Sequence, residues 1–147
     1  LGLRFGKGLQ LVNVLRDVAA DLRIGRCYLP VRDPQGLLDP GRYPALQPLY
    51  QGWLDAAVAH LDAGWCYTML IPRGLWRLRL ACIWPIWIGL ETVAQLRRAN
   101  PLDPAQRVMA AQSRVYGMLA QSVVRSVSDR LLDRAYQALH GRAGARP

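Results

Sequence analysis

Residues 7–30 read KGLQLVNVLRDVAADLRIGRCYLP, and this stretch decides the expected fold. No Gly or Pro interrupts residues 9–24, and the apolar residues recur at the three- and four-residue spacing of an α-helix. Gly25 then ends the helix, and Pro30 ends the connection that follows it. We therefore predict one helix with an apolar face toward a core. That face consists of Leu11, Val14, Leu15, Val18 and Leu22.

The same helix carries a second, polar stripe. At about 100° per residue, Gln10, Asn13, Asp17 and Asp21 fall within an arc of about 80°. Two carboxylates one turn apart provide oxygen ligands of the kind that Mg²⁺ prefers, and the ion fills its other positions with water or phosphate oxygens. The alternative is an ordinary solvated face whose aspartates pair with neighbouring cations. The spacing alone leaves both interpretations open.

The sequence around this stripe resembles the second aspartate-rich motif of the squalene/phytoene synthase family. The residues that match are Gln10, Asn13, Leu15, Arg16, Asp17, Val18, Asp21, Gly25, Arg26, Tyr28, Leu29 and Pro30. The resemblance implies an all-α fold, part of an isoprenoid-synthase-type helical bundle of about four to five helices. Residues 1–140 would be the C-terminal portion of such a domain, and residues 141–147 a disordered tail.

The resemblance also implies an activity, that of a transferase which joins two isoprenyl diphosphates head to head with Mg²⁺ as cofactor. It assigns catalysis to Asp17 and Asp21, and metal binding to these two residues together with Asn13. Diphosphate binding is assigned to Gln10, Asn13, Arg16, Arg26 and Tyr28. The implied substrate is farnesyl or geranylgeranyl diphosphate. We favour a squalene-type product, for which NADPH would be a second cofactor, over phytoene or dehydrosqualene.

A family active site also needs a first aspartate-rich motif, which in the family lies upstream of residues 1–147. We expect this missing N-terminal half to be a partner, activity to require it, and the isolated chain to be inactive. We also expect large apolar side chains of the motif helix and of residues 80–90 to be exposed without it. The alternative function is a non-catalytic assembly or interaction protein, since Met109 and Gln112 replace a basic pair of the family's last helix.

The charge and the cysteine content indicate which partners and which cellular compartment to expect. Nineteen Lys and Arg against ten Asp and Glu give a net charge of +9, which suits phosphorylated substrates or an anionic membrane surface. No zinc-ligand spacing, RNP-like strand or recognition helix accompanies the charge, so we predict no nucleic-acid partner. Three widely spaced cysteines indicate a reduced, cytoplasmic protein, with peripheral membrane association as the further expectation.

The remainder of the chain is expected to be helical apart from its connections. Residues 31–48 are rich in Pro and Gly and predict a loop, followed by a helix over residues 49–70. Residues 75–98 predict a buried helix kinked at Pro85, because the uncharged run 80–90 is too short to span a membrane. After a turn capped by Asp103, a long helix over residues 104–139 is predicted to bend at Gly117 and end at Gly141.

A few further side chains invite a functional interpretation. An aromatic set could line a cavity and stabilise a carbocation, or could simply fill the core. It comprises Tyr67, Trp76, Trp84 and Trp87. We interpret His60 as a packed or surface histidine and His140 as favourable charge at a helix end. Asp129 and Asp133 repeat the spacing of the motif, but Ser122 and Arg125 stand where it has Gln and Asn, which favours a salt-bridged surface.

Overall fold

The computed structural model describes residues 1–106, 108, 117, 120, 122 and 128–145. Over these residues the chain contains helices and no β-strand, which confirms the predicted all-α class. The α-helices are α1 (Gly2–Arg16), α2 (Val18–Arg23), α3 (Tyr43–Met69), α4 (Trp76–Leu96) and α6 (Asp129–Gly144). Short 3₁₀ helices are η1 (Gln35–Leu38), η2 (Pro40–Arg42), η3 (Arg73–Leu75) and η4 (Pro104–Gln106).

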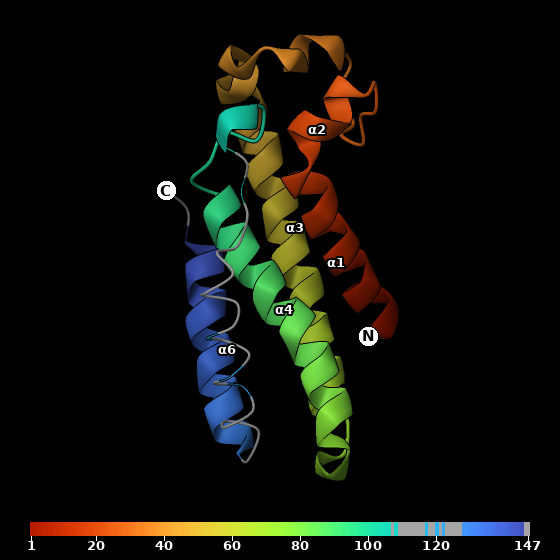
Figure 1. The fold of residues 1–147 in the computed structure, drawn as a ribbon, viewed down its shortest axis with the longest axis vertical. Helices are drawn as coiled ribbons and strands as arrows, with labels where there is room; N and C mark the ends of the chain where they lie inside the picture. The colour runs from red at the N-terminus through yellow and green to blue at the C-terminus, as the bar shows by residue number, and fades with distance from the viewer. Residues whose placement is uncertain (107, 109–116, 118–119, 121, 123–127, 146–147) are drawn as a thin grey trace.

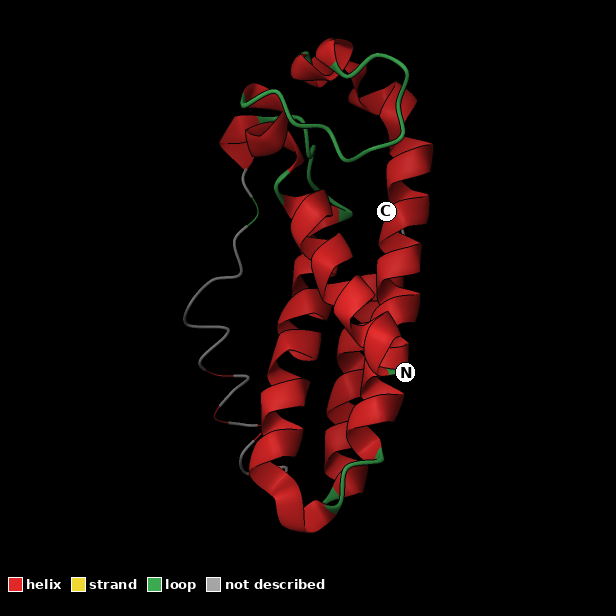
Figure 2. Ribbon diagram, turned by 90° about the vertical axis from the view of Figure 1, so that its right-hand side faces the viewer, coloured by secondary structure: helices red, strands yellow, loops and turns green. Residues whose placement is uncertain are grey.

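The long helices form an elongated bundle around α3 (Figure 1). Helix α3 contacts α1, α4 and α6, and α4 makes further contacts with α1 and α6. Helix α2 lies at one end of the bundle, with η1, η2 and η4, whereas the α3–α4 turn forms the opposite end (Figures 1 and 2). The start of α6 also lies at that opposite end, where Asp129 pairs with Arg73 of the turn.

The core consists of apolar side chains from each of the α-helices that the structure describes. Of the predicted apolar face, Leu15, Val18 and Leu22 are buried, whereas Leu11 and Val14 are half-buried. Val12, which was not predicted to belong to this face, is buried as well. The run 80–90 is buried in the same cluster through Leu80, Ile83, Ile86, Trp87 and Leu90. The expectation that these faces are exposed in this chain is therefore wrong, because α3 presents apolar residues to both α1 and α4.

Two glycines allow α1 to pack closely against α3. A Cβ on Gly64 of α3 would lie 2.6 Å from the ring of Phe5, and one on Gly8 of α1 would lie 3.0 Å from the Cβ of His60. The distance at Gly64 is too short for a side chain without movement of Phe5, and the distance at Gly8 would require His60 to shift by a few tenths of an ångström. The close helix approach thus depends on hydrogen in place of a side chain at these two positions.

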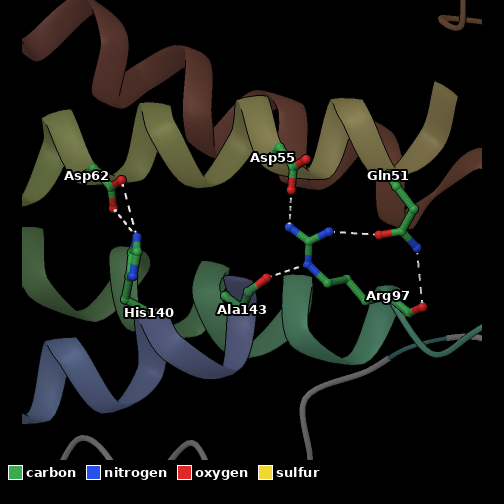
Figure 3. Close-up of polar contacts among 6 residues, drawn as sticks. All are labelled: Gln51, Asp55, Asp62, Arg97, His140 and Ala143. Atoms are coloured by element: carbon green, nitrogen blue, oxygen red, sulfur yellow. Dashed lines mark hydrogen bonds and ion pairs between the residues drawn. The ribbon is translucent and has the colours of Figure 1, made fainter. Parts of the chain in front are cut away.

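Arg97, which follows α4, connects three helices at the α2 end of the bundle (Figure 3). Its guanidinium donates to Gln51 Oε1 at 2.7 Å, to Asp55 Oδ1 at 2.6 Å and to the carbonyl of Ala143. The Gln51 amide donates in return to the Arg97 carbonyl at 3.3 Å. Because Arg97 is only 2% exposed, these partners satisfy a charge that would otherwise be buried alone.

Several predicted boundaries are wrong. Helix α3 begins at Tyr43 rather than at residue 49, since Pro44 occupies the first turn, where a missing N–H costs little, and Pro48 is tolerated one turn later. The predicted long helix 104–139 does not run unbroken, because Ser128 is extended and α6 starts at Asp129. Helix α6 also continues through Gly141 to Gly144, so the expected tail is helical over these residues. Pro85 lies within α4 without ending it.

Candidate functional site

The predicted motif helix is interrupted at its first aspartate. Helix α1 ends at Arg16 and α2 begins at Val18, and Asp17 between them has φ −98° and ψ 12°. Backbone bonds still connect successive turns across the junction, with Asp17 N–H donating to Asn13 O and Asp21 N–H donating to Asp17 O. The single predicted helix is thus two helices joined through Asp17, the first aspartate of the polar stripe.

Asp17 is held by its neighbour in sequence. Arg16 Nε donates to Asp17 Oδ1 at 3.0 Å, and Arg16 Nη2 donates to Asp17 Oδ2 at 2.8 Å. The two bonds form a bidentate arginine–carboxylate pair. Hydrogen bonding to this carboxylate raises the pKa of Arg16 above its ordinary value. Both side chains are about one third exposed, so either can exchange its partner for a ligand without crossing the core.

A pocket of about 240 Å³ opens beside this ion pair at the α2 end of the bundle. One wall comes from the α1–α2 junction and the other from the end of α4, residues 99–106 and Val108. The polar side chains that line it are Arg16, Asp17, Arg23, Asn100, Asp103 and Gln106. A cavity with two guanidinium groups and two carboxylates has the chemistry to hold an anion together with a cation.

The other predicted site residues do not line this pocket. Gln10 and Tyr28 border a wide groove of about 340 Å³ between α1 and α3, together with Lys7, Trp53 and His60. Asp21, Arg26 and Tyr28 border a small depression beside α2. Asn13 is exposed on α1 and lines none of these three sites. The structure of this chain therefore distributes the predicted set over adjoining surfaces rather than collecting it at one point.

The donor atoms suit Mg²⁺ in kind. Asp17 and Asp21 provide carboxylate oxygens one turn apart, and Asn13 provides an amide oxygen on the preceding turn. Within residues 1–106 and the other described positions, no group of three or more His, Cys, Asp or Glu side chains is placed to hold a metal ion. One or two carboxylates with phosphate oxygens and water form a common magnesium environment, so the residues present fit part of such a site.

Residues after α4 were not predicted to belong to the site. The sequence NPLDPAQ (100–106) predicted a turn with Asp103 as N-cap, and Asp103 Oδ1 indeed accepts a hydrogen bond from Ala105 N–H at 2.9 Å. Folding brings this turn to the wall opposite Asp17. Local turn chemistry gives no signal of that contact, because it depends on how α4 packs against α1.

The aromatic set does not form a shared cavity lining among the described residues. Trp87 is buried in the core, Trp84 Nε1 donates to Ser122 Oγ at 2.9 Å, and Tyr67 and Trp76 are exposed. None of the four borders the three sites described above. The interpretation as core filling holds for Trp84 and Trp87.

The two histidines pair with other side chains. His60 is half-buried, and its Nδ1 lies 3.4 Å from Arg4 Nε, in agreement with a packed histidine. His140 lies 3.3 Å from the Asp62 carboxylate of α3, an α6–α3 contact rather than a charge at a helix end (Figure 3). The predicted role of His140 is therefore wrong, because α6 continues one turn beyond it.

The second aspartate pair was predicted to belong to a salt-bridged surface. Asp129 accepts from Arg73 Nε at 2.8 Å and pairs with Arg79 Nη1 at 2.9 Å, which confirms a salt bridge at this position. Asp133 is exposed. Arg125 lies outside the described residues, as do Met109 and Gln112.

Two further features bear on the cysteines and on possible membrane-spanning helices. Cys27, Cys66 and Cys82 are free thiols. Among the helices that the structure describes, none is long and apolar enough to cross a membrane.

Comparisons with known proteins give a consistent result. The family model described as squalene/phytoene synthase matches residues 1–114. The chain is 34% identical over 125 residues to a 15-cis-phytoene synthase of Paracoccus, covering 81% of this chain and 38% of that protein. It is 32% identical over 93 residues to a 15-cis-phytoene synthase of Synechocystis, covering 60% of this chain and 26% of that protein.

A third relative differs in its named product. Over 34 residues the chain is 56% identical to a presqualene diphosphate synthase of Zymomonas mobilis, covering 23% of this chain and 11% of that protein. The chain spans less than two fifths of the length of these curated relatives. No solved structure gives a significant match.

Proposed function

Because the chain belongs to the squalene/phytoene synthase family, we propose that it forms the C-terminal part of a Mg²⁺-dependent prenyltransferase that joins two isoprenyl diphosphates head to head. The observation that carries the proposal is the pocket in which Asp17 lies beside Arg16 and Arg23. A diphosphate needs cationic partners and a divalent ion, and this wall offers donors for both.

The roles follow from the chemistry of each side chain. Asp17 and Asp21 hold the ion through carboxylate oxygens, with the Asn13 amide oxygen one turn before them. Arg16 and Arg26 bind diphosphate oxygens, and Gln10 and Tyr28 donate hydrogen bonds to the same group. Bound Mg²⁺ supplies Lewis-acid stabilisation of the departing diphosphate. Because Gln10 and Tyr28 border the neighbouring groove, they act from the side of the site away from the 240 Å³ pocket.

Arg16 has a second role in this proposal. Its two hydrogen bonds keep the Asp17 carboxylate oriented in the absence of ligand. With a diphosphate and its ion bound, the Asp17 carboxylate would hold the ion and the Arg16 guanidinium would bind phosphate oxygens, so that each charged side chain would keep a partner of opposite charge.

The identity of the product rests on weaker support. The names of the relatives divide between 15-cis-phytoene and presqualene diphosphate, so we keep squalene-type coupling as a prediction and phytoene or dehydrosqualene as alternatives. The upstream half is supplied with the chain, farnesyl and geranylgeranyl diphosphate are offered separately, and each reaction is run with and without NADPH. A C30 product supports the prediction, and a C40 product alone overturns it.

The site assignment has its own test. In the protein completed by the upstream half, Asp17→Ala or Asp21→Ala should abolish Mg²⁺-dependent diphosphate release, because each removes an ion ligand. Asp129→Ala, which removes a carboxylate from the salt bridge at the far end of the bundle, should leave release nearly unchanged once the sample is shown to be folded. Equal losses at Asp17 and Asp129 would contradict the assignment.

The alternative is a non-catalytic relative that serves as an assembly or interaction protein. The replacement of the family's basic pair by Met109 and Gln112 favours it. A completed protein that binds a prenyl diphosphate without releasing diphosphate, under conditions in which a phytoene synthase is active, would support this alternative.

A further inference from the structure

The motif helix is interrupted at Asp17 although no local signal marks an interruption there. No Gly or Pro occurs within residues 9–24, yet α1 ends at Arg16 and α2 begins at Val18. Asp17 has φ −98° and ψ 12°, in a sparsely populated region of backbone conformation. A helix that breaks without Gly or Pro commonly does so where a side chain bonds into its backbone ladder. The cause of this interruption is therefore to be sought in a tertiary contact.

Such a contact comes from Tyr50 on α3, the helix that packs along α1 (Figure 1). The Tyr50 hydroxyl donates to the Leu15 carbonyl oxygen at 2.9 Å, two residues before Asp17. In an uninterrupted helix this oxygen accepts the N–H four residues further along the chain. A second donor on the same oxygen tilts the carbonyl away from the helix axis and weakens that backbone bond. Because Tyr50 and Leu15 are both 0% exposed, water does not take the place of the hydroxyl.

The position of the Tyr50 ring is fixed by its surroundings. The ring packs edge-on against Tyr43, with 6.2 Å between the ring centres. Both residues lie in the first turns of α3, a helix of 27 residues. Burial, and to a smaller extent Tyr43, raises the pKa of the Tyr50 hydroxyl, so this group remains a neutral donor. A donor on a long, packed helix holds its acceptor more precisely than a donor on a loop does.

The interruption explains how Arg16 can pair with the residue next to it. Consecutive residues of a helix point about 100° apart and do not face each other. Arg16 nevertheless makes two hydrogen bonds to the Asp17 carboxylate, at 3.0 and 2.8 Å. The departure of Asp17 from helical dihedral angles removes the usual separation of the two side chains. The bidentate pair, and with it the direction of the Asp17 carboxylate, thus depends on the interruption.

We propose that Tyr50 is a positioning residue for Asp17. By holding the Leu15 carbonyl, its hydroxyl maintains the interruption, which orients the Asp17 carboxylate beside Arg16 at the edge of the 240 Å³ pocket. Tyr50 borders none of the three sites described above, so it acts through the backbone rather than on a ligand. The inference rests on the proposed function in that Asp17 is given the role of ion ligand. Groups that orient a metal ligand affect metal affinity as well as the stability of the fold.

The first experiment uses the 147-residue chain without metal ion or substrate. Solvent exchange of the Arg16 Nε–H is measured by NMR, with the signal assigned by its loss in Arg16→Lys. Tyr50→Phe keeps the ring and removes only the hydroxyl, and it should accelerate this exchange about tenfold, the factor that corresponds to one buried hydrogen bond. Unchanged exchange in Tyr50→Phe would overturn the proposal.

The matched control is Ile83→Val, which removes one methyl group from a fully buried side chain of α4. It should cost a similar amount of stability through lost packing, yet leave exchange of the Arg16 Nε–H as in the parent chain. Equal acceleration in the two variants would show a general loosening of the fold, and Tyr50 would then have no positioning role.

The second experiment uses the protein completed by the upstream half and measures diphosphate release against Mg²⁺ concentration. Tyr50→Phe should raise the Mg²⁺ concentration for half-maximal release about tenfold, as expected when a group that orients a metal ligand is lost. Turnover at saturating Mg²⁺ should stay within about twofold of the parent protein, because the ligands themselves remain. Ile83→Val should shift neither quantity. Lower turnover in Tyr50→Phe at every Mg²⁺ concentration, with an unchanged midpoint, would indicate a merely structural role and overturn the proposal.

The two experiments separate this inference from the proposed function. Faster exchange of the Arg16 Nε–H in Tyr50→Phe alone supports the positioning of Asp17, even where the completed parent protein releases no diphosphate and the proposed function fails. An active parent protein whose Mg²⁺ dependence is the same in Tyr50→Phe overturns the inference and leaves the proposed function standing.

Discussion

The hydroxyl of Tyr50 donates a hydrogen bond of 2.9 Å to the carbonyl oxygen of Leu15. Tyr50 is fully buried in α3, and Leu15 lies two residues before Asp17, where the motif helix is interrupted. Burial raises the pKa of the Tyr50 hydroxyl, so it remains a neutral donor. The core of the bundle is thereby connected to the backbone that carries the first aspartate of the motif.

Tyr50→Phe should destabilise the chain by about 1–2 kcal/mol, because the Leu15 carbonyl loses this buried donor. The free energy of unfolding is measured by urea denaturation followed by circular dichroism. Tyr67→Phe, which removes a hydroxyl from an exposed tyrosine of the same helix, is the control and should stay within about 0.5 kcal/mol of the parent chain. Similar losses in the two variants would contradict the role of the bond.

Arg97→Met should be more damaging, at about 2–4 kcal/mol, because it leaves Gln51 and the Ala143 carbonyl without their buried donor. The adjacent Arg98→Met changes an exposed side chain and should have little effect on the free energy of unfolding. Since Arg97 connects α3 with the C-terminal end of α6, hydrogen exchange should show faster opening of α6 in the first variant alone.

Asp129 predicts a pH dependence of stability. Hydrogen bonding to Arg73, and secondarily the interactions with Arg79, lower the pKa of Asp129 below its ordinary value of 3.8, against the opposing effect of desolvation. A carboxyl whose pKa is lower in the folded state contributes stability above its unfolded pKa, and that stability is lost as the pH falls through the folded value. The contribution should therefore be present at neutral pH and disappear in the acidic range below about pH 4.

The matched variants are Asp129→Asn and Asp133→Asn. The first should be less stable than the parent chain at pH 7, and the difference should shrink on acidification, because protonation removes the same charge from the parent. The second lies on an exposed position of the same helix and should give no comparable difference. The free energy of unfolding measured from pH 7 down to pH 3 decides between these outcomes. A difference that grows on acidification would contradict the assigned pKa direction.

How far the sequence predicts this molecule depends on the range of the interactions. The apolar spacing of the motif helix and of residues 75–98 predicted both helices and their buried faces, since amphipathic periodicity is a local signal. The interruption at Asp17 was not predicted, because no Gly or Pro marks it and a tertiary contact from Tyr50 accompanies it. Pro44 and Pro48 misled the prediction for the opposite reason, since a strong local signal was overruled by packing of α3.

The candidate site likewise combines features that the local sequence predicts with features that depend on tertiary packing. The oxygen-bearing residues and their order along the helix can be taken from the sequence, as can the resemblance to the family. Their distribution over three neighbouring surfaces cannot, since it depends on where α3 and the 100–106 turn lie relative to α1 and α2. The participation of Asn100, Asp103 and Gln106 in the pocket is a consequence of that packing.

The last prediction concerns the isolated chain, which we expect to be folded but catalytically inactive. Its apolar helix faces are buried in its own core, so it should unfold cooperatively. A diphosphate and its metal ions, however, carry more charge than Asp17 and Asp21 can balance, and the described residues contain no larger group of metal ligands. Farnesyl diphosphate with Mg²⁺ should therefore yield no diphosphate above the background without protein.

Addition of an upstream half that carries the first aspartate-rich motif should restore diphosphate release, and it should do so for the parent chain but not for Asp17→Ala. This comparison separates a missing set of ligands from a damaged fold, because both chains meet the same upstream half. Turnover by the isolated parent chain that is lost in Asp17→Ala would show that one aspartate pair suffices, and the requirement for a second motif would then be wrong.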